Sequence, residues 1–566
     1  MKKHFNTICS LLQTCRTMRE LKQLHGLMIT TSIIKEIVPL SKLVDFCTSA
    51  DSDNLSYAES VFSQIHQPSV YIWNSMIKGY SNSDNPDEAF LLYGQMLQRG
   101  HSPDHFTFPF VLKACSIVCY HDYGKCVHSR VLKTGFEVNV YVSTSLLNMY
   151  VCCEDMRSGL KVFDEIPKWN VVAWTILIAG YVNNDCASEA IRVFKDMENL
   201  NIKPNEITLV HVLVACAKSR DLGTGKLVHS CARQFGYDPF VSSCMPNLIL
   251  ATAIFDMYAK CGSLKTARDL FDKMPKRNLV AWNSMIAGYN QYGQAEEALG
   301  LFSDMLVSGF DPDKATFLSV ISACSKFGAL ALGQSFHAFV LKMNICKDVA
   351  IGTALVDMYA KSGDAKTARK IFSDLKTKDT MAWTSMIIGL AMHGHGEEAL
   401  RTFNTMQDDA TVIPDEITYI GVLSACSHVG LVEEGQRHFT EMRNVYGIEP
   451  TIEHYGCMVD LLSRAGRFEE SERLLEQMPI QPNVAVWGAL LNGCEIYENV
   501  NLADQVRSHI REVETLGSGV YVLLSNIYAR AGKWQEAKMA RELMKHKSIV
   551  KTIGRSTVEI NLSNSS

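Results

Sequence analysis

Residues Val70–Asp104 read VYIWNSMIKGYSNSDNPDEAFLLYGQMLQRGHSPD and contain two apolar segments of helical period with a polar turn between them. The first segment ends near Tyr80, and the second begins after Pro86 and closes on Gly100 and Pro103. Neither segment is long enough to form a stable helix alone in water, so each must bury its apolar stripe against a neighbour. These residues therefore predict a two-helix module that belongs to a larger stack.

Three residue types recur together along the chain. Tryptophan stands at Trp73, Trp174, Trp282, Trp383 and Trp487, at separations of 101, 108, 101 and 104 residues. A glycine follows each of the first four, at Gly79, Gly180, Gly288 and Gly389. A cysteine ends phrases such as HVLVAC and SVISAC, at Cys115, Cys216, Cys324 and Cys426. Because chance does not align three residue types at one period, the chain is an array of repeats.

Each period divides into three units of 35, 35 and 31 residues, beginning with 70–104, 105–139 and 140–170. The same triplet starts again at Val171, Leu279 and Thr380. The spacing of 108 reflects seven inserted residues near Asp238–Asn247, where Pro239 and Pro246 predict an enlarged loop. A stack of two-helix units predicts an all-α fold, a right-handed α-solenoid or superhelix.

Composition limits the possible functions. The net charge of −5 disfavours a protein that holds nucleic acid by bulk electrostatics, but not one that recognises bases. No apolar run approaches the 18 residues that a membrane helix needs, so we expect no membrane partner. The 18 cysteines include no CxxC pair, and Met1–Ser10 carries no secretory signal. We therefore expect reduced, buried cysteines, and no metal or other cofactor.

Three histidines also share one recurring position, in the phrases GKCVHS, GKLVHS and GQSFHA: His128, His229 and His337. Considered alone, they resemble a catalytic or metal-binding set. Their spacing of about three units along a solenoid is too long for one shared ligand. We expect them to be packing residues, like the aligned cysteines and tryptophans.

The unit phrases resemble the pentatricopeptide repeat (PPR), in the plant PLS subfamily that alternates standard, long and short units. Standard units carry phrases such as VVAWTILIAGY followed by SEAIRVFKDM, and short units read like TALVDMYAKSGDAKTARKIFSDLKTKD. Near the C-terminus, VAVWGALLNGCEIYENVNLADQV and GVYVLLSNIYARAGKWQEAKMARELMKHKSIVK resemble the E-type extension motifs of that family. The resemblance implies helix–turn–helix PPR repeats stacked as a solenoid.

The resemblance also implies three regions. Residues 1–69 would be degenerate long and short repeats, 70–483 the PPR array, and 484–566 the E-type extension. The chain departs from the family where Ile553 replaces the usual Pro and Thr557 the usual Trp, so we expect a degenerate last turn.

PPR proteins with this extension are similar to organellar RNA-editing factors, which mark a cytidine for conversion to uridine. The resemblance implies a sequence-specific single-stranded-RNA-binding protein in the mitochondrion, with the chloroplast as the alternative. It also implies a DYW-type deaminase and small editing cofactors as partners in trans. One alternative is a factor for splicing, stability or translation of organellar transcripts. Another is a protein-scaffolding helical solenoid.

The resemblance further implies that two residues of each unit, the fifth and the last, face one base; we call them the recognition pair. In the seven standard and short units between 70 and 415, the fifth residue is always Asn or Thr and the last is always Asp or Asn. The pairs are Asn74/Asp104, Thr144/Asn170, Thr175/Asn205, Thr252/Asn278, Asn283/Asp313, Thr353/Asp379 and Thr384/Asp415. Long units have apolar fifth residues, which we expect to discriminate little: Pro109, Val210, Leu318 and Ile420.

Helix capping is an ordinary alternative explanation for an Asp or Asn at the end of a unit. Capping does not explain a polar fifth residue, one turn into an apolar helix, in all seven units. An ionised Asp only accepts hydrogen bonds and so suits guanine or uracil, whereas Asn suits adenine or cytosine. The family adds that Thr at the fifth position favours purines and Asn pyrimidines. The predicted 5′→3′ target is U-x-A-A-x-A-U-x-G-G, with the outer pairs Ser41/Ser69 and Gly456/Asn483 left unassigned.

A zinc deaminase needs an HxE segment and a PCxxC segment. His395-Gly396-Glu397 matches the first by itself, and no CxxC is present to complete the site. The chain ends six residues after Ile560, where catalytic relatives carry a deaminase domain. We therefore expect no enzyme activity and a deaminase supplied in trans.

Overall fold

A computed structural model of the chain describes residues 2–49, 54–166, 169–240, 247–274, 277–343, 345, 348–409, 411–511 and 518–546. Every regular element within these residues is helical, so the predicted all-α class is confirmed. The helices form two compact units, Met1–Arg277 and Asn278–Ser566. None of the helices in the described residues is both long and apolar enough to cross a bilayer.

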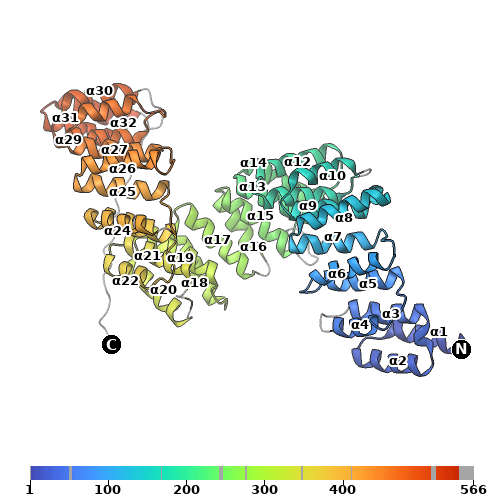
Figure 1. The fold of residues 1–566 in the computed structure, drawn as a ribbon. Coiled ribbons are helices and arrows are strands. Elements are labelled where there is room, and N and C mark those ends of the chain that lie inside the picture. The colour runs from blue at the N-terminus through green and yellow to red at the C-terminus, as the bar shows by residue number, and fades with distance from the viewer. Residues whose placement is uncertain are drawn as a thin grey trace. The chain divides into compact units, whose positions relative to one another are not determined.

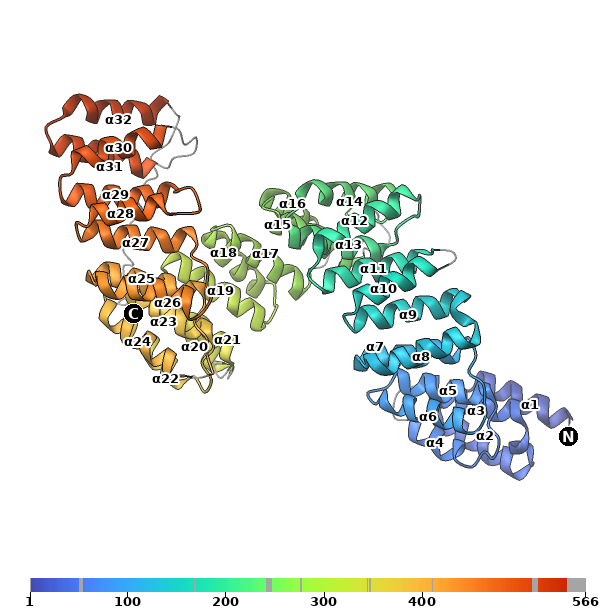
Figure 2. The ribbon, with the colours of Figure 1, turned by 45° about the horizontal axis from the view of Figure 1, so that its top comes forward.

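The first compact unit is a stack of helical hairpins (Figures 1 and 2). Its 3-10 turns are η1 (Ile33–Lys35) and η3 (Phe136–Val138). Its α-helices are α1 (Lys2–Thr14), α2 (Met18–Thr30), α3 (Ile37–Ser49), α4 (Leu55–Phe62), α5 (Val70–Ser81), α6 (Asp87–Gln98), α7 (Thr107–Val118), α8 (His121–Thr134), α9 (Val140–Cys152), α10 (Met156–Glu165), α11 (Val171–Asn183), α12 (Ala187–Asn199), α13 (Glu206–Ser219), α14 (Leu222–Gln234), α15 (Leu248–Lys260) and α16 (Leu264–Lys273).

The second compact unit is also built from helical hairpins. Its α-helices are α17 (Leu279–Gln291), α18 (Ala295–Val307), α19 (Lys314–Phe327), α20 (Leu330–Lys342), α21 (Val349–Lys361), α22 (Ala365–Asp374), α23 (Thr380–Met392), α24 (Gly396–Asp408), α25 (Glu416–Val429), α26 (Val432–Asn444), α27 (Ile452–Arg464), α28 (Phe468–Glu476), α29 (Val484–Ile496), α30 (Val500–Arg511), α31 (Ser518–Arg530) and α32 (Trp534–His546).

The first helix of each repeat has an odd number and the second an even number. Within each compact unit, every first helix packs against the first helix of the next repeat, for example α5 against α7 and α21 against α23. Second helices pack against their own first helix and, in most repeats, against the next one. The first helices therefore form one continuous layer in each compact unit, as a solenoid requires.

The recurring tryptophans and glycines explain this layer. Trp73, Trp174, Trp282 and Trp383 are at most 6% exposed. Gly79, Gly180 and Gly389 lie close against the preceding repeat: a Cβ built on Gly389 would be 2.2 Å from the Cβ of Ala360 in the preceding first helix. These residues recur in the sequence because they pack at the contact between neighbouring repeats.

The prediction of buried cysteines is confirmed at the aligned positions and wrong at four others. Cys115, Cys216, Cys324 and Cys426 are buried, and burial raises the pKa of the Cys115 thiol to about 12. Four others, which do not recur with the period, are exposed: Cys119, Cys126, Cys152 and Cys186. A cysteine outside the period has no packing position to occupy, so its burial did not follow from the repeat.

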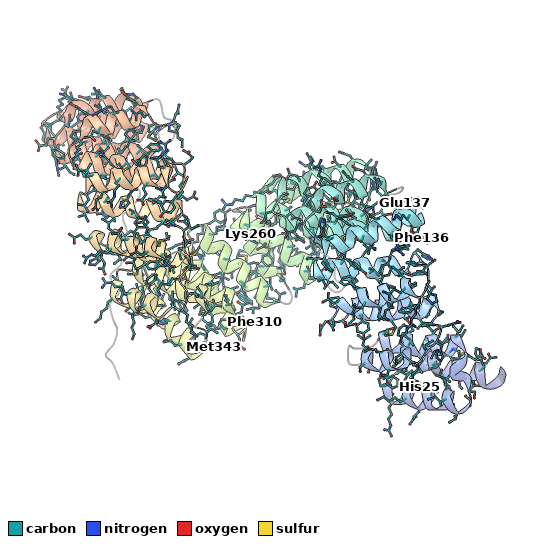
Figure 3. The ribbon with its side chains drawn as sticks, viewed as in Figure 1. His25, Phe136, Glu137, Lys260, Phe310 and Met343 are labelled. Carbon is teal, nitrogen blue, oxygen red and sulfur yellow. The ribbon has the colours of Figure 1, made fainter. Side chains whose placement is uncertain are left out.

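The recurring histidines are packing residues, as predicted. The Nδ1 of His128, His229 and His337 lies 2.8, 3.1 and 3.0 Å from a tyrosine hydroxyl in the next first helix. The partners are Tyr150, Tyr258 and Tyr359. Near the N-terminus, His25, labelled in Figure 3, makes a similar contact of 2.6 Å. Each of the three recurring histidines therefore joins a second helix to a first helix, whereas His25 joins α2 to Tyr57 in α4.

The predicted insertion begins in an anchored turn. Asp238 is 2% exposed, and its carboxylate accepts hydrogen bonds from Arg233 Nε and the Phe240 backbone, both at 3.0 Å. Pro239 follows in this turn, and Pro246 lies outside the described residues.

Mild acid should destabilise the chain through the recurring histidines. Burial lowers the pKa of His128 and His337 below the ordinary 6.5. The unfolded chain therefore binds more protons in the window below pH 6.5, and stability falls as the pH falls through it. The double variant His128→Gln/His337→Gln should lose less thermal stability between pH 7.5 and 5.5 than the parent chain. An equal loss in both would show that other groups cause the acid sensitivity.

Candidate nucleic-acid interface

All seven last residues of the recognition pairs make a capping hydrogen bond at the start of a first helix; six are the N-cap residue, and Asp104 stands three residues before α7. Each side-chain Oδ1 accepts a hydrogen bond from the backbone N–H three residues later, at 2.8 or 2.9 Å. The alternative of helix capping is therefore correct for every one of them. All hydrogen bonds that these side chains make within the described residues go to Oδ1. Each Asp keeps Oδ2, an acceptor, and each Asn keeps Nδ2, a donor.

The structure brings the two members of a pair together in the standard repeats. Asn74 Nδ2 donates to Asp104 Oδ1 at 3.0 Å, and Asn283 Nδ2 donates to Asp313 Oδ1 at 2.9 Å. In the other two standard repeats, a buried threonine joins the members. Thr208 links Thr175 to Asn205, and Thr418 links Thr384 to Asp415, through contacts of 2.7 to 2.9 Å.

In the short repeats, the two members of the recognition pair are in contact less uniformly. Thr353 Oγ1 donates to Asp379 Oδ1 at 3.3 Å. Thr144 Oγ1 instead donates to the carbonyl of Val140 in its own helix, at 2.6 Å. Thr252 makes the same kind of bond, to Leu248 at 2.8 Å. Thr252 belongs to the first compact unit, and Asn278 is the first residue of the second.

Thr144 and Asn170 nevertheless line one cavity, of about 630 Å³. The second residues of three consecutive repeats, Phe106, Tyr141 and Val172, line the same cavity. The second, fifth and last positions of neighbouring repeats therefore share one surface in this part of the chain.

The side chains at the fifth position of the repeats are more buried than polar side chains usually are. Asn74, Thr353 and Thr384 are 6%, 3% and 6% exposed, and Thr175 is 9% exposed. Asn283 and the two remaining threonines are half-buried, while the last residues are half-buried or exposed. A ligand could reach only an edge of the four buried side chains in this conformation. The exposed surface comes mainly from the last and second positions.

The second residue of each repeat is a candidate that the sequence reasoning missed. Ten of these residues are large, apolar and 48 to 78% exposed: Val38, Tyr71, Phe106, Tyr141, Val172, Ile207, Ile249, Val280, Met381 and Ile417. A residue three positions before the fifth lies on the same helix face. The sequence signal of these second residues is an apolar side chain that recurs at a position which the helical period assigns to the solvent-facing side. Such side chains suit the flat face of a planar ligand such as a base.

Two of the carboxylates are ionised near neutral pH. Burial raises the pKa of Asp104, but hydrogen bonds from the Thr107 backbone and Asn74 outweigh it, and the pKa is lowered overall. The pKa of Asp313 is lowered in the same way, with burial opposed by Thr316 and Asn283. Both side chains therefore act only as acceptors, as the predicted selectivity requires.

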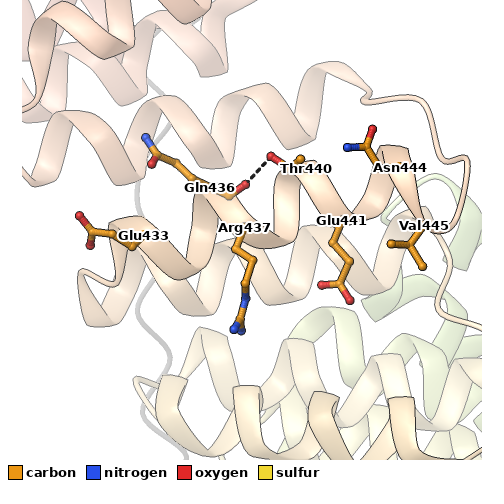
Figure 4. Close-up of a pocket in the computed structure, with 7 residues that line it drawn as sticks. All are labelled: Glu433, Gln436, Arg437, Thr440, Glu441, Asn444 and Val445. Carbon is orange, nitrogen blue, oxygen red and sulfur yellow. Dashed lines mark hydrogen bonds between the residues drawn. The ribbon is translucent and has the colours of Figure 1, made fainter.

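Two other places in the described residues were candidates for a site, and their polar groups are already bonded within the protein. A hollow of about 510 Å³ lies along α26, where the Thr440 hydroxyl donates to the Gln436 carbonyl at 2.8 Å (Figure 4). The Glu441 carboxylate at this hollow is already bonded to Gln407 and His438, each at 2.8 Å. His395 precedes α24, and Glu397 pairs with Arg401 at 3.5 Å. No group of three metal-ligating side chains converges in the part of the chain that the structure describes.

Comparison with known proteins identifies the repeats. The PPR repeat family model matches residues 68–116, 170–218 and 277–326, and a second PPR repeat model matches 141–171, 250–279, 353–379, 381–409, 417–445 and 453–480. A pentatricopeptide repeat-containing protein of Arabidopsis thaliana is 59% identical over 561 residues, which cover 99% of each chain. The chain belongs to the pentatricopeptide-repeat family. The predicted family is thereby confirmed.

Further PPR proteins of Arabidopsis thaliana are similar over nearly the whole chain. One named as mitochondrial is 37% identical and covers 98% of this PPR protein and 86% of its own length. Another, named as chloroplastic, is also 37% identical and covers 98% of this PPR protein and 78% of its own length.

The crystal structure of the PPR protein PPR10 in complex with an 18-nucleotide psaJ RNA element has the same fold. Its TM-score is 0.59 at 17% identity, over 96% of this PPR protein and 78% of PPR10. The predicted solenoid of PPR repeats is confirmed by this likeness.

An E motif matches residues 497–559 and so confirms the resemblance of the C-terminal phrases to that motif. Its described part contains the helices α30, α31 and α32. The departures at Ile553 and Thr557 lie outside the described residues.

Proposed function

We propose that this PPR protein binds single-stranded RNA by sequence and acts as a specificity factor for organellar C-to-U editing. One observation carries the RNA-binding part. The fifth residue of every recognition pair lies in a first helix, and the last residue keeps one side-chain atom outside the capping contact. That atom is an acceptor in Asp and a donor in Asn, which is the difference needed to distinguish base edges.

The exposed second residues support the same proposal. They lie beside the recognition pairs and provide apolar or aromatic surfaces on which bases can stack, at about 1–3 kcal/mol per base for aromatic contacts. PPR10, which has the same fold, is in complex with an 18-nucleotide psaJ RNA element in its crystal structure. The proposed target remains U-x-A-A-x-A-U-x-G-G. A protein scaffold has no use for caps that offer an acceptor in some repeats and a donor in others.

The editing role rests on the C-terminal E motif, residues 497–559, and on the family resemblance. We propose that a DYW-type deaminase and small editing cofactors act in trans. Since relatives carry mitochondrial and chloroplastic names, we propose an organellar location, the mitochondrion first and the chloroplast second.

Two experiments separate the alternatives. Sequencing organellar RNA from a loss-of-function line should show one or a few cytidines that are no longer edited. Unchanged editing with altered splicing or transcript levels would favour the alternative, a factor for splicing, stability or translation of organellar transcripts. A gel shift with Thr353→Asn tests the scaffold alternative, because a scaffold should show no change in base preference.

Binding should depend only weakly on salt. Two lysines of the first helices are already engaged: Lys218 bonds the Val182 carbonyl and Asp185, and Lys326 bonds the Asn290 carbonyl. Stacking and base-edge contacts should therefore outweigh release of counterions from phosphates. For single strands, eight phosphate contacts would give a slope of log K against log salt near about −5.6, and we expect a shallower one. A slope that steep or steeper contradicts the proposed balance of contacts.

A further inference from the structure

Each long repeat carries a buried threonine at its third position: Thr107, Thr208, Thr316 and Thr418. All four are fully buried, with 0% exposure. Each hydroxyl contacts both members of the recognition pair in the preceding standard repeat. Thr316 Oγ1 lies 2.6 Å from Asn283 Oδ1 and 2.8 Å from Asp313 Oδ1, and accepts a bond from the Asp313 backbone at 3.2 Å. Thr107 makes the same three contacts with Asn74 and Asp104.

The contact is specific to one kind of junction. Where a standard repeat follows a short one, the third position is alanine, at Ala173, Ala281 and Ala382. Alanine has no hydroxyl, so it cannot make this bond. The fifth residues of those short repeats instead bond their own helix, as Thr144 does, or the aspartate directly, as Thr353 does. Within the described residues, the buried threonine at the third position thus occurs only where a long repeat follows a standard one.

The carboxylate and the hydroxyl together fix which way the asparagine amide faces. The ionised carboxylate of Asp313 only accepts, so Asn283 must turn Nδ2 toward it. The amide oxygen then faces Thr316, which has one proton to donate. Asp313 Oδ1 already accepts hydrogen bonds from Asn283 Nδ2 and from the Thr316 backbone N–H. The Thr316 hydroxyl therefore donates its one proton to Asn283 Oδ1, which is nearer to it than Asp313 Oδ1 is. A rotated amide would place two acceptors against each other.

We propose that the third-position threonine of each long repeat is a positioning residue, which holds the recognition pair of the preceding standard repeat in one orientation. The inference rests on the proposed RNA-binding function. It gives the long repeats a part in specificity although their own fifth residues are apolar. The long repeat acts through the pair before it, without touching the base.

The test is Thr316→Val, which keeps the shape and removes the hydroxyl, with Thr316→Ser as the variant that restores it. Two pairs of RNA oligonucleotides are compared in competition binding. One pair differs as U or C at the nucleotide that faces Asn283/Asp313, and the other as G or A at the nucleotide that faces Thr353/Asp379. The second pair is the internal control, since its repeat is followed by Ala382.

We expect Thr316→Val to reduce discrimination at the first nucleotide by about fivefold, the usual weight of one hydrogen bond. Discrimination at the second should not change, and Thr316→Ser should behave as the parent. Unchanged discrimination at the first nucleotide overturns the proposal. So does an equal loss at both nucleotides, which would mark a merely structural role.

The variant Asn283→Ala separates this proposal from the proposed function. If Asn283→Ala abolishes the U preference and Thr316→Val leaves it intact, the threonine proposal fails and base recognition stands. If neither variant alters the preference of an RNA that still binds, the proposed recognition itself fails. Should Thr316→Val not fold, Thr107→Val provides the same test at Asn74/Asp104.

Discussion

Exchanging Asn283 for Thr and Asp313 for Asn should change the preferred nucleotide at that repeat from uracil to adenine. In the parent chain, Asp313 uses Oδ1 for the helix cap and keeps Oδ2 as an acceptor. Asn at this position keeps the cap but offers Nδ2, a donor, in place of that acceptor. We expect the affinity ratio for two RNAs that differ only at this nucleotide to shift by about tenfold in each direction. Competition binding of the two RNAs measures it.

Asp348→Asn is the matched control for that exchange. Asp348 also caps a first helix through Oδ1, but it ends a long repeat whose fifth residue is Leu318. We therefore expect the same chemical change at Asp348 to leave the base preference as it was. If the control shifts the preference as much as the double exchange does, recognition does not depend on the pair.

Gly389→Ala should destabilise the stack by about 3 kcal/mol, at the upper end of the usual cost of overpacking. The added Cβ would lie 2.2 Å from the Cβ of Ala360 and 3.0 Å from its backbone atoms. A backbone cannot move aside as a flexible side chain can, so α21 and α23 must separate. Because a repeat array opens locally, hydrogen exchange of the amides in these two helices is the appropriate measurement.

Gly300→Ala provides the control within the same compact unit. Gly300 lies in α18, and a Cβ built there would meet no atom within 4 Å. Alanine is favoured over glycine inside a helix by about 0.8–1.0 kcal/mol, so this variant should slow exchange in α18. Faster exchange in both variants, or in neither, would contradict the close approach that we assign to the recurring glycine.

The repeat architecture was predictable because its signals are local and repeated. Trp282 and Gly288 recur with the period because each repeat packs on the next through the same positions. The capping role of Asp313 was predictable from its place after a turn and before an apolar helix. Within the described residues, the structure places a helix hairpin in every repeat where the sequence predicted one.

What the sequence did not show depends on contacts between repeats. The burial of Thr353 is produced by neighbouring helices, which a period cannot reveal. The exposure of Tyr141 was overlooked because an apolar residue in an apolar helix resembles core. Cys152 was expected to be buried, but it ends a helix and does not recur with the period, so no packing position holds it.

The threonine contacts were also hidden. Thr316 stands three residues after Asp313, which is the spacing of an ordinary capping box, and the structure shows that box. The sequence does not show that the same hydroxyl reaches back 33 residues to Asn283. A side chain that serves both a cap and a recognition pair is visible only once the helices are packed.

The central claim is that each standard or short repeat recognises one base through its recognition pair. The most direct measurement is selection of bound sequences from a random RNA pool by the full chain. We expect enrichment of U-x-A-A-x-A-U-x-G-G, with little preference at the positions that face the long repeats. Bound RNAs without that pattern, or without the change from A to G along it, would contradict the account.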